Sequence, residues 1–240
     1  MKICNRALAP VLALMLCNVA SAVDGDLDPT FGTGGFALAG TTGGELLLVS
    51  APAVQADGKI LICSKLDGGP PSGADFLVVR FDADGTLDTD FSFDGKVTVD
   101  FDGREDWCGA LIQQSDGKIL VVGSSMLDAN HHYDFAAARL NADGSLDATF
   151  GNGSGKVIIP FDATASNLDV AEAVALQPGG KIVIAGGIVD APQNQVFAVV
   201  RLLQDGSRDT TFNTTGRATV DFGFGMRNAA VCGSMGQGTS

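Results

Sequence analysis

Carboxylates are the most regularly spaced residues in this sequence that could do chemistry. Asp82, Asp84 and Asp88 surround Gly85, a spacing that resembles calcium loops, in which hard oxygen ligands converge on one cation. The second copy retains oxygen-bearing side chains, but the third has Leu203 at the first position. A working calcium site also needs more oxygens than three carboxylates. The favoured interpretation is a tight turn in which Asp accepts backbone hydrogen bonds and Gly adopts positive φ, with calcium as the alternative.

The aromatic and imidazole side chains form a second set of candidates. The only two histidines, His131 and His132, adjoin the only tyrosine, Tyr133, in a segment that is not repeated. No third metal ligand is evident, so a solvated loop is favoured over a metal site. The only tryptophan, Trp107, stands at the predicted entry of a strand. It is interpreted as an edge residue that covers the sheet, with a stacking platform for a sugar as the alternative.

Three arginines recur at the ends of apolar runs, at Arg80, Arg139 and Arg201. An arginine stem can lie on apolar surface while its head reaches a carboxylate. Structural ion pairs with the repeated Asp residues are therefore predicted between units. A ligand-binding ring of arginines around a central axis is the alternative.

Signatures of catalysis are absent from the sequence. No Gly-x-Ser-x-Gly elbow, phosphate loop or zinc motif occurs in a suitable context. Gly34-Gly35 and Gly43-Gly44 are interpreted as turn glycines, because no helix follows them. We therefore expect no catalytic, cofactor-binding or metal-binding residue and no enzyme activity. A polysaccharide hydrolase or lyase is the alternative, since the many acidic residues allow carboxylate pairs.

These residues belong to a repeat of about 60 residues. The first marker is Leu-Asp-x-x-Phe, at residues 27–31, 87–91 and 146–150, with a variant at 208–212. The second is Asp-Gly-Lys-Ile, at 57–60 and 116–119, with Gly-Gly-Lys-Ile at 179–182. The third is Phe-x-x-x-Arg, at 76–80, 135–139 and 197–201, and the fourth is an Asp-Gly pair at 84–85, 143–144 and 205–206.

Each unit reads as four short strands. In the second unit they are expected at 96–101, 110–114, 118–123 and 134–140, and Ser115-Asp116-Gly117 is a hairpin signal. No segment has a sustained helical period, so little helix is expected. The fold class is all-β: a propeller-like array of four-stranded antiparallel blades, about three and a half units long and open or incomplete.

The four markers in register, three times over, resemble the delta-60 repeat family of bacterial exported proteins. The resemblance covers residues ~25–225. It implies a propeller-like β architecture and a location outside the cytoplasm. It implies no particular activity.

The expected organisation has three parts. Residues 1–22 form a signal peptide, with the basic Lys2 and Arg6, an apolar run and small residues before the cleavage site. Residues 23–225 form the delta-60-type repeat domain, with units at ~25–85, 86–144 and 145–206 and a partial one at 207–225. Residues 226–240 form an irregular tail. A truncated chain, a short open stack and a pair of copies that close one propeller are three explanations for the partial unit, and an open edge favours a homodimer.

Charge and cysteine content narrow the partners and the location. The net charge of −13 repels phosphate backbones and anionic lipids, so nucleic acid is not expected as a partner. No segment is long and apolar enough for a membrane span. Export places the protein in the periplasm, on the cell surface or outside the cell. Cys63, Cys108 and Cys232 remain after cleavage. Buried strand thiols are favoured, with a Cys63–Cys108 bridge as the alternative.

The variable segments give the functional hypothesis. They are residues 65–74, 126–133 and 188–195, and each precedes the last predicted strand of its unit. Variable loops on one face of a repeat array are the usual binding surface. We therefore expect a non-catalytic exported scaffold, without a cofactor, that binds an unknown protein or glycan of the cell envelope.

Overall fold

The structure is a computed structural model that describes residues 25–40, 46–67, 73–129, 131–161, 168–191 and 194–221. The expected signal peptide, the tail at 226–240 and Cys232 lie outside these residues. Within them, the one helical element is a single 3₁₀ turn at Gly151–Gly153. No helix of the described chain has the length and apolar character that a bilayer crossing requires.

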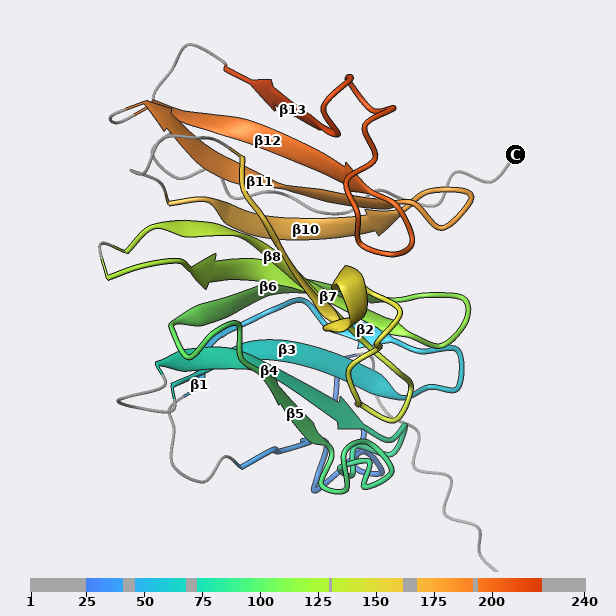
Figure 1. Cartoon of the computed structure of the whole chain (residues 1–240). Coiled ribbons are helices and arrows are strands. Elements are labelled where there is room, and N and C mark those ends of the chain that lie inside the picture. The colour runs from blue at the N-terminus through green and yellow to red at the C-terminus, as the bar shows by residue number, and fades with distance from the viewer. Residues whose placement is uncertain are drawn as a thin grey trace, which may run out of the picture.

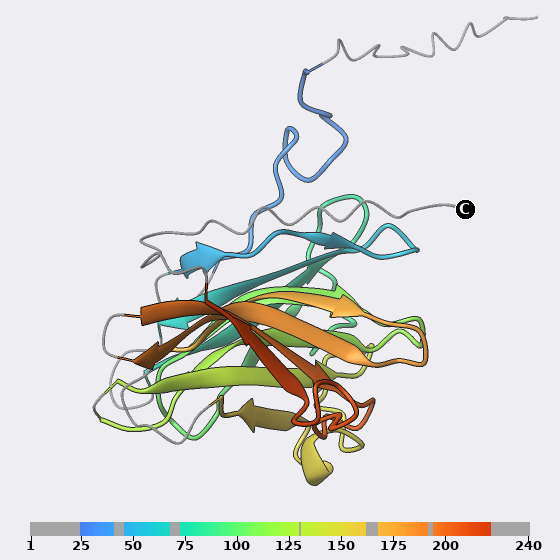
Figure 2. The same ribbon diagram turned by 90° about the horizontal axis from the view of Figure 1, so that it is seen from above.

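The chain forms three stacked antiparallel sheets, and the second sheet lies between the other two (Figure 1). The view from above shows that the sheets overlie one another (Figure 2). This confirms the all-β, propeller-like array of four-stranded blades. The strands of the first sheet are β1 (Leu46–Val49), β2 (Ala53–Val54), β3 (Ile60–Asp67), β4 (Ala74–Phe81) and β5 (Lys96–Val99).

The second and third sheets repeat one simple order. The second consists of β6 (Asp106–Gln113), β7 (Ile119–Met126), β8 (Tyr133–Leu140) and β9 (Lys156–Ile159), paired in that order. The third consists of β10 (Val170–Leu176), β11 (Ile182–Ala191), β12 (Asn194–Leu202) and β13 (Arg217–Val220). In the first sheet, β1 and β2 pair with opposite halves of β3, so together they take the place of β6 or β10.

The sheets are offset from the sequence units by one strand. The sequence places Lys96–Val99 first in the second unit, yet this strand pairs with Phe76–Val79 of the unit before. The strands β9 and β13 pair with the preceding unit in the same way. The last strand of each sheet therefore belongs to the next sequence unit, so strand pairing joins neighbouring units.

Two apolar layers fill the space between the sheets. The middle strands of each sheet are apolar on both faces, as the sequence indicates. A neighbouring sheet covers both faces of the second sheet and the inner face of the first and of the third. Between the first and second sheets lie Phe76, Phe91 and Ile119, all fully buried. Phe135 and Ile184 are fully buried between the second and third sheets. Each such side chain contributes roughly 1.5–3 kcal/mol through its burial.

Candidate interaction surface

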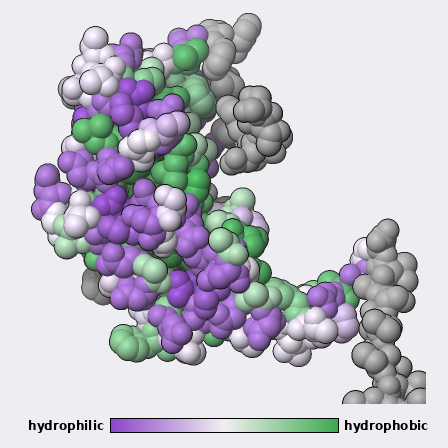
Figure 3. Space-filling view, turned by 90° about the vertical axis from the view of Figure 1, so that its right-hand side faces the viewer, coloured by the Kyte–Doolittle hydropathy of each residue, from purple (hydrophilic) through white to green (hydrophobic). Residues whose placement is uncertain are grey.

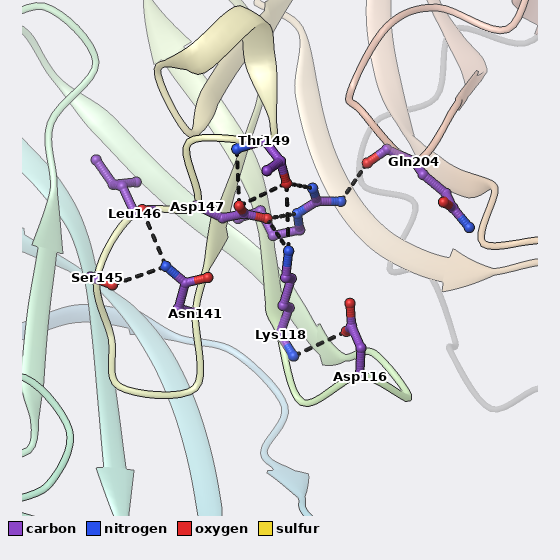
Figure 4. A network of polar contacts seen from close by, with 9 residues as sticks. Asp116, Lys118, Asn141, Ser145, Leu146, Asp147, Thr149 and Gln204 are labelled. Atoms are coloured by element: carbon purple, nitrogen blue, oxygen red, sulfur yellow. Dashed lines mark hydrogen bonds and ion pairs between the residues drawn. The ribbon is translucent and has the colours of Figure 1, made fainter.

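The repeated Asp and Arg residues build a polar cluster at each unit junction (Figure 4). At the junction of the second and third units, Asp147 Oδ2 accepts hydrogen bonds from Arg139 Nε at 2.6 Å and from Lys118 Nζ at 2.8 Å. Asp147 Oδ1 accepts one from the backbone N–H of Thr149 at 3.0 Å. Arg139 also donates to the carbonyl of Gln204 in the next unit. The cluster therefore closes a turn and ties two units together.

The same arrangement surrounds the equivalent aspartates of the other units. Asp88 binds Arg80 at 2.5 Å and Lys59 at 2.8 Å, and Asp209 binds Arg201 and Lys181, both at 2.8 Å. Each guanidinium also lies over a phenylalanine ring, with distances to the ring centroid of 4.5, 4.8 and 4.9 Å. The predicted structural ion pairs are confirmed. A ring of arginines presented to a ligand is not supported, because these side chains are already engaged.

Electrostatics at this junction fixes the carboxylate in its charged form. Burial by itself raises the pKa of Asp147, but the hydrogen bonds from Lys118, Thr149 and Arg139 outweigh it. The pKa of this carboxyl therefore lies well below its usual range. A carboxylate in this state is a structural anion and cannot act as a general acid near neutral pH.

The Asp-Gly turns have the geometry of simple capped turns. Asp84 Oδ1 accepts from the backbone N–H of Thr86 at 2.9 Å and from its hydroxyl at 2.7 Å. Gly85 adopts a φ of +85°. The other two carboxylates of the calcium-like spacing, Asp82 and Asp88, are bound by Lys59. The turn interpretation therefore accounts for all three aspartates, and we propose no cation there.

The first and second sheets are joined by a disulfide bond. Cys63 on β3 and Cys108 on β6 are bonded, with a Cα–Cα distance of 6.0 Å. Our favoured interpretation, buried free thiols, was wrong for these two residues. The sequence alone could not bring them together, because 45 residues separate them and their approach depends on how the sheets stack.

A charged and aromatic network lies at one end of this same junction. Lys65, on β3, forms an ion pair with Glu105, which precedes β6. The Tyr133 hydroxyl donates to Glu105 Oε2 at 3.0 Å. The Lys65 bond lowers the pKa of Glu105, and burial together with Glu105 raises the pKa of Tyr133. The sequence analysis missed this network, because Lys65 and Glu105 occupy no repeated position.

Trp107 belongs to the same network. Its ring meets the Tyr133 ring edge-on, with 5.1 Å between centroids, and Lys65 Nζ lies 5.5 Å from its centroid. Because the ring is half-buried and contacted by two side chains, it fits the predicted role of an edge residue that covers the sheet. A free stacking platform for a sugar is less consistent with these contacts.

The two histidines lie in the adjoining β7–β8 loop. His132 Nδ1 lies 2.8 Å from Asp128 Oδ2, and His131 is exposed with a φ of +64°. The His132–Asp128 contact joins the two ends of the loop. Among the described residues, the one group with metal-like spacing contains neither histidine.

The two ends of the stack differ in character. Figure 1 shows the β7–β8 connection on the left of the sheets and the β6–β7 and β10–β11 turns on the right. The right-hand end is largely hydrophilic (Figure 3), although Val54, Phe93, Leu146 and Leu203 are exposed at this end. The left-hand end, called here the variable-loop end, comprises the described parts of the β3–β4, β7–β8 and β11–β12 connections and the starts of β6 and β10. It exposes Leu127 and Leu168, and beside it lies an open cleft of about 330 Å³ lined by Trp107, Gly109 and Glu172.

Comparison with known families supports the repeat assignment. Residues 55–91, 114–150 and 177–212 match a family model described as "Domain of unknown function (DUF5122) beta-propeller". These three segments are similar to beta-propeller repeats of this kind. Each DUF5122 match begins just before a Lys-Ile marker and ends at the next Leu-Asp-x-x-Phe marker or its variant, so it spans one polar cluster and two strands. No catalytic family is identified by this match, and no curated protein matches the chain.

Proposed function

We propose that this protein is an exported, non-catalytic interaction module of the delta-60 type, which binds a protein or glycan of the cell envelope through its variable-loop end. The observation that carries the proposal is that repeated and unrepeated residues occupy different places in the structure. The repeated Asp, Arg, Lys and Phe positions are engaged in contacts within the scaffold. The unrepeated residues gather at one end of the stack.

The composition of the variable-loop end supports this role. The connections between the second and third strands of the sheets run from Asp67 to Ala74, from Met126 to Tyr133 and from Ala191 to Asn194. They differ in sequence, and the third is shorter. The exposed leucines, the aromatic Trp107 and the adjacent cleft provide both apolar and polar contacts. A rigid scaffold that displays variable loops is a common arrangement for binding.

The alternative, a polysaccharide hydrolase or lyase, requires carboxylates that a polymer can reach. Among the described residues one group of three carboxylates converges, formed by Asp75, Asp100 and Asp106. It lies at a junction between sheets, and Asp106 is fully buried. A buried carboxylate cannot protonate a glycosidic oxygen of a large substrate, so the observations favour binding over catalysis.

The proposal is tested by comparing the two ends of the stack. The purified chain is screened against immobilised glycans and against isolated cell-envelope proteins. In one variant, residues 127–132 are replaced by a Gly-Ser segment of equal length. The matched control, Asp57→Asn with Asp116→Asn, removes charge from the opposite end and keeps the turn acceptors. We expect the loop variant to lose binding and the control to retain it. Equal binding by both variants would contradict the proposal.

A further inference from the structure

Three carboxylates converge where the first sheet meets the second. Asp75 lies on β4, Asp100 follows β5, and Asp106 begins β6. Each offers an oxygen, and these oxygens all lie within 4.8 Å of one another. Oxygens that surround a calcium ion lie 2.3–2.6 Å from it, so a pair of them can be separated by up to about 5 Å. The three carboxylates are therefore spaced closely enough to bind one ion.

Two oxygens of this group lack partners although they are buried. Asp106 is 0% exposed, and its Oδ2 accepts a hydrogen bond from the backbone N–H of Phe101 at 2.7 Å. Its Oδ1 has no hydrogen-bond donor among the described residues, and the same is true of the buried Asp75 Oδ1. An unpaired buried carboxylate oxygen is costly, which indicates that a missing ligand completes the group.

The nearby Ser125 hydroxyl does not resolve the deficit. Ser125 lies opposite Asp106 across the β6–β7 pair and is also fully buried. Its hydroxyl lowers the pKa of Asp106 as a hydrogen-bonding neighbour, yet Asp106 Oδ1 and Ser125 Oγ both lack a partner within ordinary hydrogen-bond geometry among the described residues. Ser125 Oγ is therefore a further unpaired oxygen beside the cluster.

Within the group, the charge of one carboxylate raises the pKa of another, and the nearby Lys156 Nζ donates to the backbone carbonyl of Asp100 at 2.6 Å rather than to a carboxylate. Burial, with the charges of Asp100 and Asp75, raises the pKa of Asp106 to about 7. Burial and the charge of Asp100 raise the pKa of Asp75 to about 6. By contrast, the junction aspartate Asp147 is held by both Arg139 and Lys118. Among the described residues, no Lys or Arg forms an ion pair with a carboxylate of this group, in contrast to the repeated clusters.

We propose that Asp75, Asp100 and Asp106 bind a divalent cation, Ca²⁺, which links the first sheet to the second. The ligand set favours this ion because all the available donors are hard oxygens, with no His or Cys among them. One oxygen of Asp100 already accepts a hydrogen bond from the Gly103 N–H at 2.5 Å, so its other oxygen is the one that binds the ion. Because three carboxylates supply fewer oxygens than Ca²⁺ requires, water completes the coordination. The site is distinct from the Asp-Gly turns that the sequence spacing suggested.

The next junction provides an internal comparison. Asp134 and Asp169 occupy the positions equivalent to Asp75 and Asp106, and both are buried. The third position is Pro160, which follows β9 as Asp100 follows β5 and has no carboxylate. With one carboxylate fewer, this junction has a weaker ligand set. We therefore expect one calcium site in each chain, at the first junction.

Terbium provides a direct probe, because it replaces Ca²⁺ and luminesces when an adjacent tryptophan is excited. The only tryptophan, Trp107, adjoins Asp106 in the sequence. Tb³⁺ is added to the purified chain after treatment with EDTA, and emission is recorded under tryptophan excitation. We expect sensitised emission that saturates and that Ca²⁺ abolishes by competition. Emission no greater than that of free Tb³⁺ would overturn the proposal.

Variants of the exposed loop distinguish ion binding at these three carboxylates from attraction by the overall negative charge of the protein. Asp100→Asn removes one ligand at an exposed position, so the fold is retained, and it should weaken Tb³⁺ and Ca²⁺ binding about tenfold or more. Asp102→Asn, two residues further along the same exposed loop, is the matched control and should leave binding unchanged. Equal affinity in these two variants would refute the site. Competition by Mg²⁺ as strong as that by Ca²⁺ would refute the choice of ion.

Discussion

The two junctions between sheets share one framework and differ at one end. Both contain an Arg–Asp–Lys cluster and a fully buried phenylalanine, Phe91 or Phe150. Only the first has a disulfide bond, and Val122 and Ala171 occupy the positions equivalent to Cys63 and Cys108 in the second. The repeat therefore specifies how sheets stack, and substitutions at unrepeated positions specialise one junction.

The difference extends along the strands toward the variable-loop end. At the first junction Lys65 and Trp107 form a cation–π contact. The equivalent residues at the second junction are Ser124 and Val170, which cannot form one. The specialised part of the first junction thus combines a covalent bond, an ionic network and an acidic group. The Phe135–Phe161 ring pair of the second junction is no such difference, since it has its counterpart in Phe76–Phe101 at the first.

The largest expected effect tests the shared framework. Phe91→Ala and Phe150→Ala each remove a fully buried ring, so each should lower the free energy of unfolding by about 3–5 kcal/mol in urea denaturation. Phe212→Ala is the comparison, because Phe212 is partly exposed in the last cluster and should cost less. A negligible loss at either junction would contradict the view that both are built alike.

The next largest effect tests the disulfide bond that distinguishes the first junction from the second. The double variant Cys63→Val with Cys108→Ala installs the residues of the second junction in the first. It should lose about 2–4 kcal/mol of stability, because the bond that constrains the unfolded chain is absent. A reducing agent should lower the melting temperature of the parent chain but not that of the variant. A parent chain that is insensitive to reduction would contradict the stabilising role of the bond.

The decrease in the free energy of unfolding at low pH tests the ion pairs that both junctions share. Since the folded-state pKa of Asp147 is lowered, its contribution is present above the unfolded pKa near 4 and is lost as pH falls through the folded pKa. Asp147→Asn should therefore lose about 2 kcal/mol at pH 7 and show a flatter decline below pH 4. The measurement is chemical denaturation from pH 7 down to pH 2. An unchanged acid slope would show that this carboxylate does not contribute.

The smallest effect tests the network at the variable-loop end. Tyr133→Phe removes the hydroxyl that donates to Glu105 and keeps the ring contact with Trp107. Because Lys65 still binds Glu105, the loss should be only about 1 kcal/mol by thermal denaturation. A loss several times larger would mean that the network, rather than the core, holds the first junction together.

The sequence predicted most of the framework because repetition makes it redundant. Leu-Asp-x-x-Phe and Asp-Gly-Lys-Ile recur with their turns, strands and charges in register, so their structural roles could be inferred before the fold was known. The one-strand offset between units and sheets could not be inferred. Strand order along the chain does not state which neighbour a strand pairs with.

The specialised part of the first junction could not be predicted from the sequence, for a different reason. Asp75, Asp100 and Asp106 lie on or beside different strands and match no motif, and the sequence offered the Cys63–Cys108 bridge only as the alternative to free thiols. Their proximity depends on how two sheets stack, which is a tertiary property. At Asp82, Asp84 and Asp88 the favoured interpretation from the sequence, a capped turn with calcium as the alternative, agrees with the capped turn and ion pairs of the structure.

The number of calcium ions bound per chain tests the central claim that the repeat builds the scaffold while unrepeated residues add function. Isothermal titration of Ca²⁺ into the EDTA-treated chain should give one site, which Asp100→Asn removes or severely weakens. Two or three equivalent sites per chain would mean that the repeated turns bind the ion. No binding at all would leave the first junction without the specialised site that we propose. Either result would contradict the account.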